Sequence, residues 1–160
     1  MKLGILLHDL HDRENEMARH LLRIAERNAA DHEIHHLARD LATWSQAHVR
    51  SLAEIAKRYE VELDPEPDSD TAVTQRLLEK TGELLGRRSE ASLALLHDLR
   101  KVYVDAAGLS LDWETAGQIA QATRDGDLLD LVSHCHPDTL RQMRWANAKV
   151  KETSPQIFTS

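Results

Sequence analysis

Residues 3–28, LGILLHDLHDRENEMARHLLRIAERN, carry a series of positions spaced alternately by four and three residues, with one acidic residue near its centre. The members of this series are Leu3, Leu7, Leu10, Glu14, Met17, Leu21, Ile24 and Asn28. Such spacing places every member on one side of a helix and is typical of a helix buried along a seam against its neighbours. The sequence therefore predicts a first helix over about residues 2–29, with Glu14 inside the seam.

A second apolar series follows almost at once, and a histidine interrupts it. Its members are Ile34, Leu37, Leu41, Trp44, His48, Leu52, Ile55 and Tyr59. This series predicts a second helix over about residues 32–60, with Asp31 as its N-cap. The turn is so short that the two helices are expected to be antiparallel neighbours. Glu14 and His48 each lie 17 residues from Asp31, so we expect them to face each other.

Residues 61–70 are the clearest linker in the chain, since they contain two prolines among several acidic residues. Ten extended residues reach about 33 Å, so this linker can make a local turn or cross over along the bundle. A third helix is expected over residues 71–107, with Gly108 as its C-terminal stop. Ser110 is then the expected N-cap of a fourth helix.

The fourth helix is expected over residues 111–152. Asp125-Gly126-Asp127 allows a bend in it, and Pro137 predicts a kink, because proline removes a helical hydrogen bond. Residues 153–160 are expected to fray or to lie across a neighbour. Four long helices in residues 1–160 predict a single all-α domain, an antiparallel four-helix bundle.

Composition and charge disfavour several classes of function. The net charge is −7 and the basic residues are scattered among acidic ones, whereas a nucleic-acid surface needs clustered Lys and Arg. The longest wholly apolar run near the start is Ile5-Leu6-Leu7, so we expect no signal peptide, no membrane span and a cytoplasmic protein. The sequence contains neither a Gly-x-Ser-x-Gly motif nor a glycine-rich phosphate loop, which favours a protein without enzymatic activity.

The run from Leu7 to Glu16, LHDLHDRENE, resembles the first helix of ferritin-like proteins, especially their small bacterial stress-associated branch. The rhythm of the segment ending in AEIAKRYE at Glu60 is similar, and the resemblance covers mainly residues 3–60. It implies a bundle-centred di-iron site, with Glu14 at the position of a carboxylate ligand. Iron or another divalent metal is the cofactor that this resemblance suggests.

Most of the other ligands that such a site requires are missing. A di-iron bundle uses one Glu from each of two helices and a Glu-x-x-His motif from each of the other two. The residue three before His48 is Ser45, and Glu33-Ile34-His35-His36 lies at the start of its helix, far from the level of Glu14. The third and fourth predicted helices contain no Glu-x-x-His. A ferritin-like fold with an eroded metal centre is the resulting expectation.

Two interpretations of the Glu14–His48 pair remain open. The two side chains can bind one divalent metal through a carboxylate oxygen and an imidazole nitrogen. They can also form a buried polar network with Arg88, which interrupts the third apolar stripe and would balance the charges. The network is the interpretation that we favour.

Other histidines give weaker candidates for metal binding. His134-Cys135-His136 offers soft ligands, but adjacent helical residues point about 100° apart, and Cys135 lies in an apolar stripe where its thiol should be inert. His32, His35 and His36 form a surface chelate of the kind that binds metal adventitiously.

Two functions follow from these observations. The first is a structural or interaction protein that forms a homodimer or binds a protein partner, with an exposed Trp145 expected to mark the interface. The alternative is a ferritin-like protein that binds iron or another divalent metal through Glu14 and His48.

Overall fold

The computed structural model describes residues 2–68 and 88–160, and its described part contains α-helices and no strand. The α-helices are α1 (Leu3–Arg27), α2 (His32–Ala56), α4 (Arg88–Thr123) and α5 (Gly126–Thr159), and η1 (Lys57–Tyr59) is a 3-10 turn. Within these ranges, none of the helices combines the length and apolarity that crossing a bilayer requires. The all-α class predicted from the sequence is confirmed, whereas residues 71–87 of the third helix predicted over 71–107 lie outside the described residues.

The first two helices form where the sequence predicts them. All but the last position of the α1 series are buried, Glu14 included. Asp31 caps α2, because its carboxylate accepts a hydrogen bond of 3.1 Å from the backbone N–H of Ile34. After η1 the left-handed backbone of Glu60 (φ 59°) ends the helical path.

The predicted break at Gly108 and Ser110 is wrong. α4 runs without interruption through both residues, because Leu109 and Trp113 belong to a face that stays buried on either side of the glycine. An interior glycine costs a helix only about 1 kcal/mol, which such burial outweighs. The turn comes instead at Arg124, whose backbone is left-handed (φ 55°).

The last helix therefore begins at Gly126 instead of residue 111. Asp125 caps it by accepting a 3.1 Å hydrogen bond from the backbone N–H of Leu128. α5 is continuous through Pro137 and Pro155, and the kink expected at Pro137 stays a prediction. The fraying expected for residues 153–160 is also wrong, since the helix continues to Thr159.

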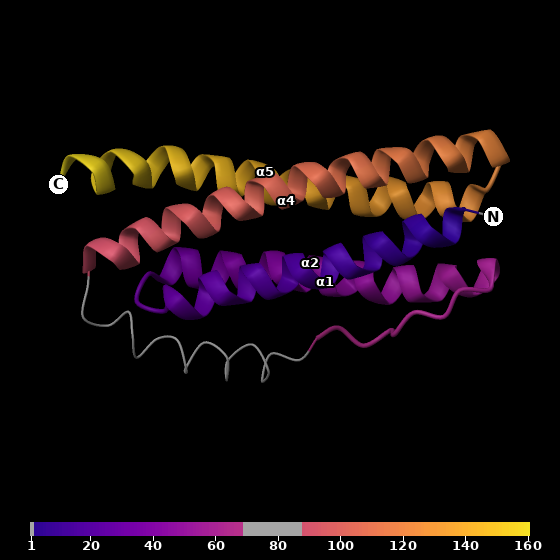
Figure 1. The fold of residues 1–160 in the computed structure, drawn as a ribbon, viewed down its shortest axis with the longest axis horizontal. Helices are drawn as coiled ribbons and strands as arrows, with labels where there is room; N and C mark the ends of the chain where they lie inside the picture. The colour runs from indigo at the N-terminus through magenta and orange to yellow at the C-terminus, as the bar shows by residue number, and fades with distance from the viewer. Residues whose placement is uncertain (1, 69–87) are drawn as a thin grey trace.

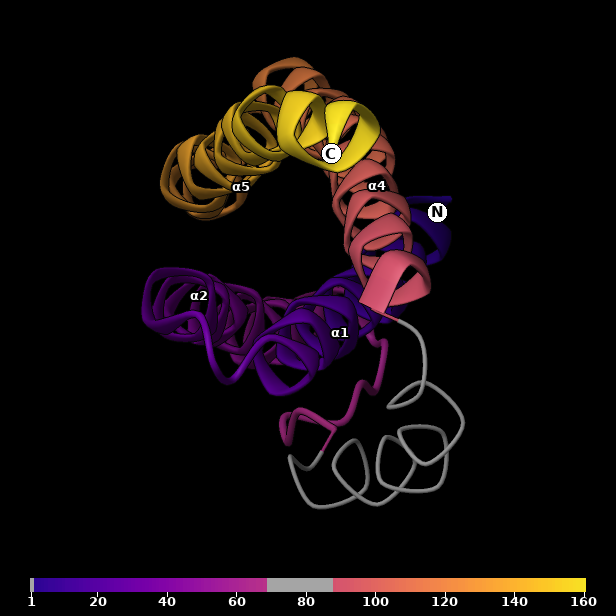
Figure 2. The ribbon, with the colours of Figure 1, turned by 90° about the vertical axis from the view of Figure 1, so that its left-hand side faces the viewer.

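The helices are arranged as two pairs, α1 with α2 and α4 with α5, which meet mainly where α1 packs on α4 (Figure 1; Figure 2). Contacts between basic and acidic side chains join α1 to α4 in reversed order along the two helices, which therefore run in opposite directions. These pairs are Arg13–Asp112, His20–Asp105 and Arg27–Asp98. The core between the helices is mostly aliphatic, and Trp113 is its largest fully buried side chain.

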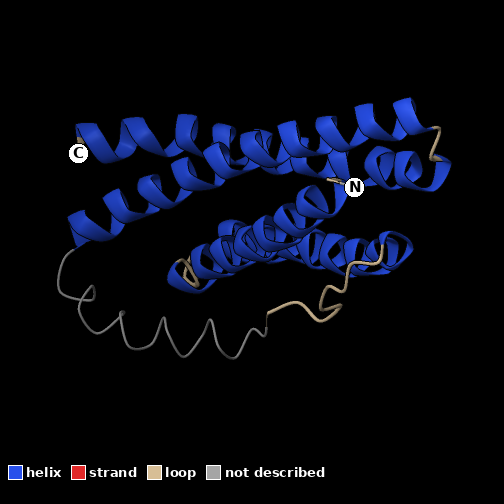
Figure 3. Ribbon diagram, turned by 45° about the vertical axis from the view of Figure 1, so that its right-hand side comes forward, coloured by secondary structure: helices blue, strands red, loops and turns tan. Residues whose placement is uncertain are grey.

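The segment after α2 follows α1 along the bundle, so its described part is not a local turn (Figure 3). The backbone oxygen of Asp64 contacts His11 Nε2 at 2.7 Å, and the backbone N–H of Asp68 donates to Asn15 Oδ1 at 3.3 Å. Arg19, one turn further along α1, pairs with the Asp68 carboxylate. α4 accordingly begins at the end of the molecule opposite to the end of α2 (Figure 1).

Candidate functional site: a buried histidine between two carboxylates

Glu14 of α1 and His48 of α2 meet in the core of the molecule. The exposed fractions of these residues are 0% and 1%. His48 Nδ1 lies 3.0 Å from Glu14 Oε1, within hydrogen-bond distance. The equal spacing of the two residues from Asp31 therefore does bring their side chains together.

Two further side chains, from α4 and α5, complete a cluster to which each long helix contributes one residue. His48 Nε2 lies 3.0 Å from Asp138 Oδ2, and Trp113 Nε1 donates a 3.0 Å hydrogen bond to Glu14 Oε1. The rings of His48 and Trp113 meet edge to face, with their centroids 6.0 Å apart. We refer to Glu14, His48, Trp113 and Asp138 as the central network.

The central network holds His48 as an imidazolium. Each ring nitrogen faces a carboxylate oxygen, so both nitrogens must carry a proton in order to donate. Burial lowers the pKa of His48, but the charge of Glu14, the contact with Cys135 and the hydrogen bond with Glu14 outweigh it and raise that pKa to about 11. The network thus contains one cation between two carboxylates.

The residues of the His134-Cys135-His136 run point in three different directions. Cys135 is fully buried against His48, and burial raises the pKa of its thiol, although the contact with His48 opposes this. His136 Nε2 lies 2.8 Å from Ser110 Oγ of α4, while His134 is exposed. The three side chains therefore do not converge on one ion, and a protonated buried thiol is a poor nucleophile.

Arg88 is the first residue of α4, and its side chain lies outside the described residues. It precedes Trp113 by 25 residues on the same helix, which corresponds to about 37 Å. Beside Glu14 and His48, where the sequence predicts the side chain of Arg88, α4 and α5 instead contribute Trp113 and Asp138. The positive charge of the cluster is supplied by His48 itself.

Asp138 and Trp113 were missed by the sequence analysis for different reasons. Trp113 belongs to the apolar stripe of its helix, so the sequence pattern indicates a packed side chain and not a hydrogen-bond donor. Asp138 follows Pro137, a residue that suggests a kink and not a functional side chain. It nevertheless lies three residues after the buried Cys135. That spacing of i and i+3 was the available signal for a shared face.

One atom of the central network remains without a partner. Glu14 Oε2 is buried and makes no hydrogen bond to any residue in the described part of the chain. A metal ion could use this oxygen, but both nitrogens of His48 already face carboxylate oxygens at 3.0 Å. Metal binding would also have to remove a proton from a histidine whose pKa is raised.

The remaining histidine candidates lie on the surface or make separate contacts. The rings of His32 and His36 are stacked 6.2 Å apart and both residues are exposed. His35 Nδ1 contacts the backbone oxygen of Ala25 at 2.7 Å, and Glu33 pairs with Lys149. The surface chelate of His32 and His36 is sterically possible, and it lies far along α2 from His48.

No protein-family model, curated protein or solved structure matches this chain.

Proposed function

We propose that this protein is a non-catalytic structural or interaction protein, built as an antiparallel ferritin-like four-helix bundle whose metal centre is replaced by the central network. The observation that carries this proposal is that both nitrogens of His48 are taken by carboxylates. The network therefore balances its buried cation without a metal. Side chains paired in this way stabilise one packing of the helices and leave neither nitrogen of His48 free to bind a metal.

The places of the polar residues support the ferritin-like interpretation. Glu14 stands on α1 where a bundle-centred site requires a carboxylate, and Ser45-x-x-His48 on α2 stands where it requires Glu-x-x-His. Cys135-x-x-Asp138 has the same spacing on α5, and Trp113 stands on α4 where a second single Glu belongs. The path of the described linker along α1 also fits the single crossover of that fold.

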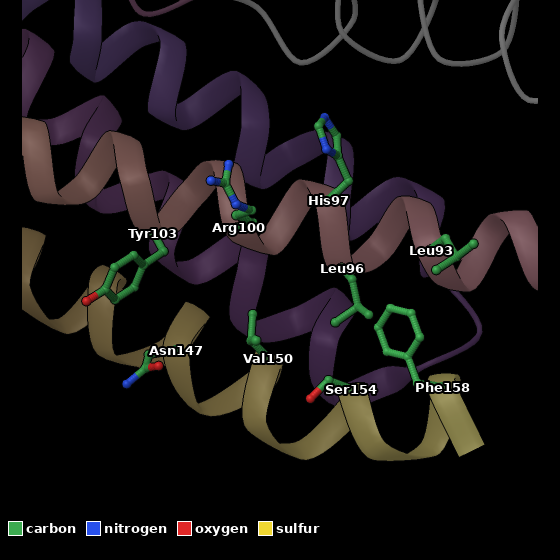
Figure 4. A pocket seen from close by; sticks show the side chains of 9 residues that line it. All are labelled: Leu93, Leu96, His97, Arg100, Tyr103, Asn147, Val150, Ser154 and Phe158. Atoms are coloured by element: carbon green, nitrogen blue, oxygen red, sulfur yellow. The ribbon is translucent and has the colours of Figure 1, made fainter. Parts of the chain in front are cut away.

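An apolar groove supports an interaction role. It lies between the first half of α4 and the end of α5, has a volume of about 490 Å³, and is lined largely by apolar side chains (Figure 4). Phe158 stands at one end of the groove beside Leu96 and is 72% exposed. Leu93 and Tyr103 add further exposed apolar surface, and surfaces of this kind mark interfaces. Trp145 is half-buried against the core and does not mark this surface.

We propose a second copy of this chain as the occupant of the groove. A two-fold axis brings the same surface patch of both subunits together. A patch that carries both the projecting Phe158 ring and the groove is therefore complementary to its own copy. Phe158 of each subunit would then enter the groove of the other, and the homodimer would bury both rings.

Sedimentation equilibrium of the full chain tests this dimer. The wild-type protein should be dimeric at tens of micromolar, and Phe158→Glu should be monomeric with unchanged helicity, because a carboxylate cannot enter an apolar groove without a partner. Ile5 is 66% exposed at the far end of α1, so Ile5→Glu is the matched control and should stay dimeric. A monomeric wild-type protein, or a dimeric Phe158→Glu variant, would refute the proposal.

The second candidate function is binding of iron or another divalent metal by Glu14 and His48, and the unpartnered Glu14 Oε2 favours it. Elemental analysis after anaerobic iron loading and desalting separates the two functions. Stoichiometric iron that is lost in both Glu14→Gln and His48→Gln would establish the metal site. Less than about 0.1 equivalent in the wild-type protein would leave the polar network as the role of these residues.

A further inference from the structure

A second cluster of ionisable side chains lies between α1 and α4, apart from the central network. Glu16 and His20 are one turn apart on α1, and Lys101 and Asp105 are one turn apart on α4. Glu14 and Glu16 are only two residues apart, but successive helical residues turn by about 100°, so the two carboxylates point to nearly opposite sides. The cluster therefore faces the outer side of the contact between the two helices.

Three potential metal ligands converge in this cluster. His20 Nδ1 lies 3.0 Å from Asp105 Oδ2, and His20 Nε2 lies 3.7 Å from Glu16 Oε1. One ligand atom from each of the three residues can be chosen so that all lie within 4.8 Å of one another. Ligands around a single zinc ion lie about 3.4 Å apart, so one nitrogen of His20 would bind, and side-chain rotations would bring the two carboxylate oxygens to that spacing.

His20 and Asp105 are close together without forming a hydrogen bond. His20 is only 8% exposed, and both its Nδ1 and Asp105 Oδ2 are buried atoms with no hydrogen-bond partner within residues 2–68 and 88–160. The two atoms lie 3.0 Å apart, but their alignment is too poor for a hydrogen bond. Two buried polar atoms that approach without bonding are stabilised if a cation is placed between them.

The environment also keeps His20 in the form that binds metals. Burial lowers the pKa of His20, and Lys101 and Arg23 add to this effect, whereas Asp105 and Glu16 oppose it. A lowered pKa keeps the imidazole neutral at physiological pH, and the neutral ring is the ligand.

Lys101 already places a positive charge beside the same two carboxylate oxygens. Its Nζ lies 3.9 Å from Glu16 Oε1 and 3.6 Å from Asp105 Oδ2, distances that are longer than hydrogen bonds. The Lys101 side chain is 42% exposed and can swing into solvent. This ammonium group is a loosely held cation that a more strongly bound ion can displace.

We propose that Glu16, His20 and Asp105 form a binding site for a divalent transition metal of the zinc class, with Lys101 as the competing cation. One imidazole and two carboxylates are ligands that zinc accepts. Glu16 and Asp105 also line a neighbouring polar cavity of about 370 Å³, from which water can reach the fourth coordination position. This site is independent of the function proposed for the central network.

Calorimetric titration of the metal-free full chain with Zn²⁺ tests this site. The wild-type protein should show one site that is weakened at least about tenfold in His20→Gln and in Asp105→Asn. His36→Ala, which removes the exposed surface chelate, and Glu14→Gln, which alters the central network, should both retain it. Lys101→Met should bind Zn²⁺ several-fold more tightly, because the competing charge is gone.

Co²⁺ absorption and circular dichroism distinguish the loss of a metal site from the loss of the fold. Bound Co²⁺ should give d–d bands that are lost in Asp105→Asn while the helicity stays at the wild-type level. Equal Zn²⁺ affinity in wild type and His20→Gln would overturn the proposal, as would binding that disappears in His36→Ala or in Glu14→Gln. Unchanged affinity in Lys101→Met would refute the role given to that lysine.

Discussion

At the scale of single residues, Glu14 is the side chain on which the central network depends. It accepts hydrogen bonds from His48 and Trp113 with one oxygen, in a fully buried position. Its position was predictable from the sequence because an acid interrupts an otherwise apolar series. What it contacts across the bundle was not predictable, since Trp113 and Asp138 come from helices whose register the sequence does not determine.

Replacing Glu14 should therefore be costly. Glu14→Ala leaves the His48 cation without its nearest counter-charge and the Trp113 N–H without an acceptor, so we expect a loss of roughly 3–5 kcal/mol in the free energy of unfolding. Urea denaturation measures this loss. Glu54→Ala, at an exposed Glu54–Lys57 pair, should change stability by less than about 0.5 kcal/mol. A cost below about 1 kcal/mol for Glu14→Ala would contradict the network.

The protonation of His48 should make stability fall as pH rises. The folded-state pKa of about 11 lies above the ordinary value of 6.5, so the folded protein keeps a proton that the unfolded chain releases. This stabilisation is complete below about pH 6.5, declines by up to about 1.4 kcal/mol per pH unit above it, and is lost above about pH 11. Urea denaturation between pH 7 and 9 should show this decline in the wild-type protein and in His32→Gln, and a much flatter profile in His48→Gln. Equal slopes in all three proteins would exclude the imidazolium.

At the scale of helices, prediction succeeded where periodicity and a capping residue agreed. α1 and α2 have a long apolar series and a cap at Asp31, and both were predicted closely. The sequence misplaces the boundary between α4 and α5 because a glycine such as Gly108 commonly ends a helix, although apolar residues remain in phase on both sides of it. Asp125 carried the correct signal, but was assigned to a bend.

Gly108 gives a direct test of this interpretation. It lies exposed in the interior of α4, and a Cβ added there would meet no atom within 4 Å among the described residues. Gly108→Ala should therefore stabilise the protein by about 0.5–1 kcal/mol, because alanine favours the helix without a clash. The thermal midpoint measures the change, and a destabilised variant would indicate that the helix is broken at this position.

At the scale of the whole molecule, the three contacts between basic and acidic side chains of α1 and α4 repeat at intervals of seven residues on both helices. Arg13, His20 and Arg27 face Asp112, Asp105 and Asp98. If one helix slid past the other by seven residues, about 10 Å, two of the three pairs would form again with exchanged partners. This outer row of basic and acidic side chains therefore accepts more than one alignment of the two hairpins.

The central network does not repeat. After such a slip, Glu14 would have no indole donor and Asp138 would have no imidazolium, so a misaligned bundle would contain unpaired buried charges. The network thus favours the native alignment of the two hairpins over shifted alignments of similar energy. This holds whatever the network contributes to the net stability of the fold. Replacing Glu14 and His48 together by leucine should keep the chain helical and compact while its amide NMR spectrum shows several sets of resonances. A single sharp set would show that packing alone defines the alignment.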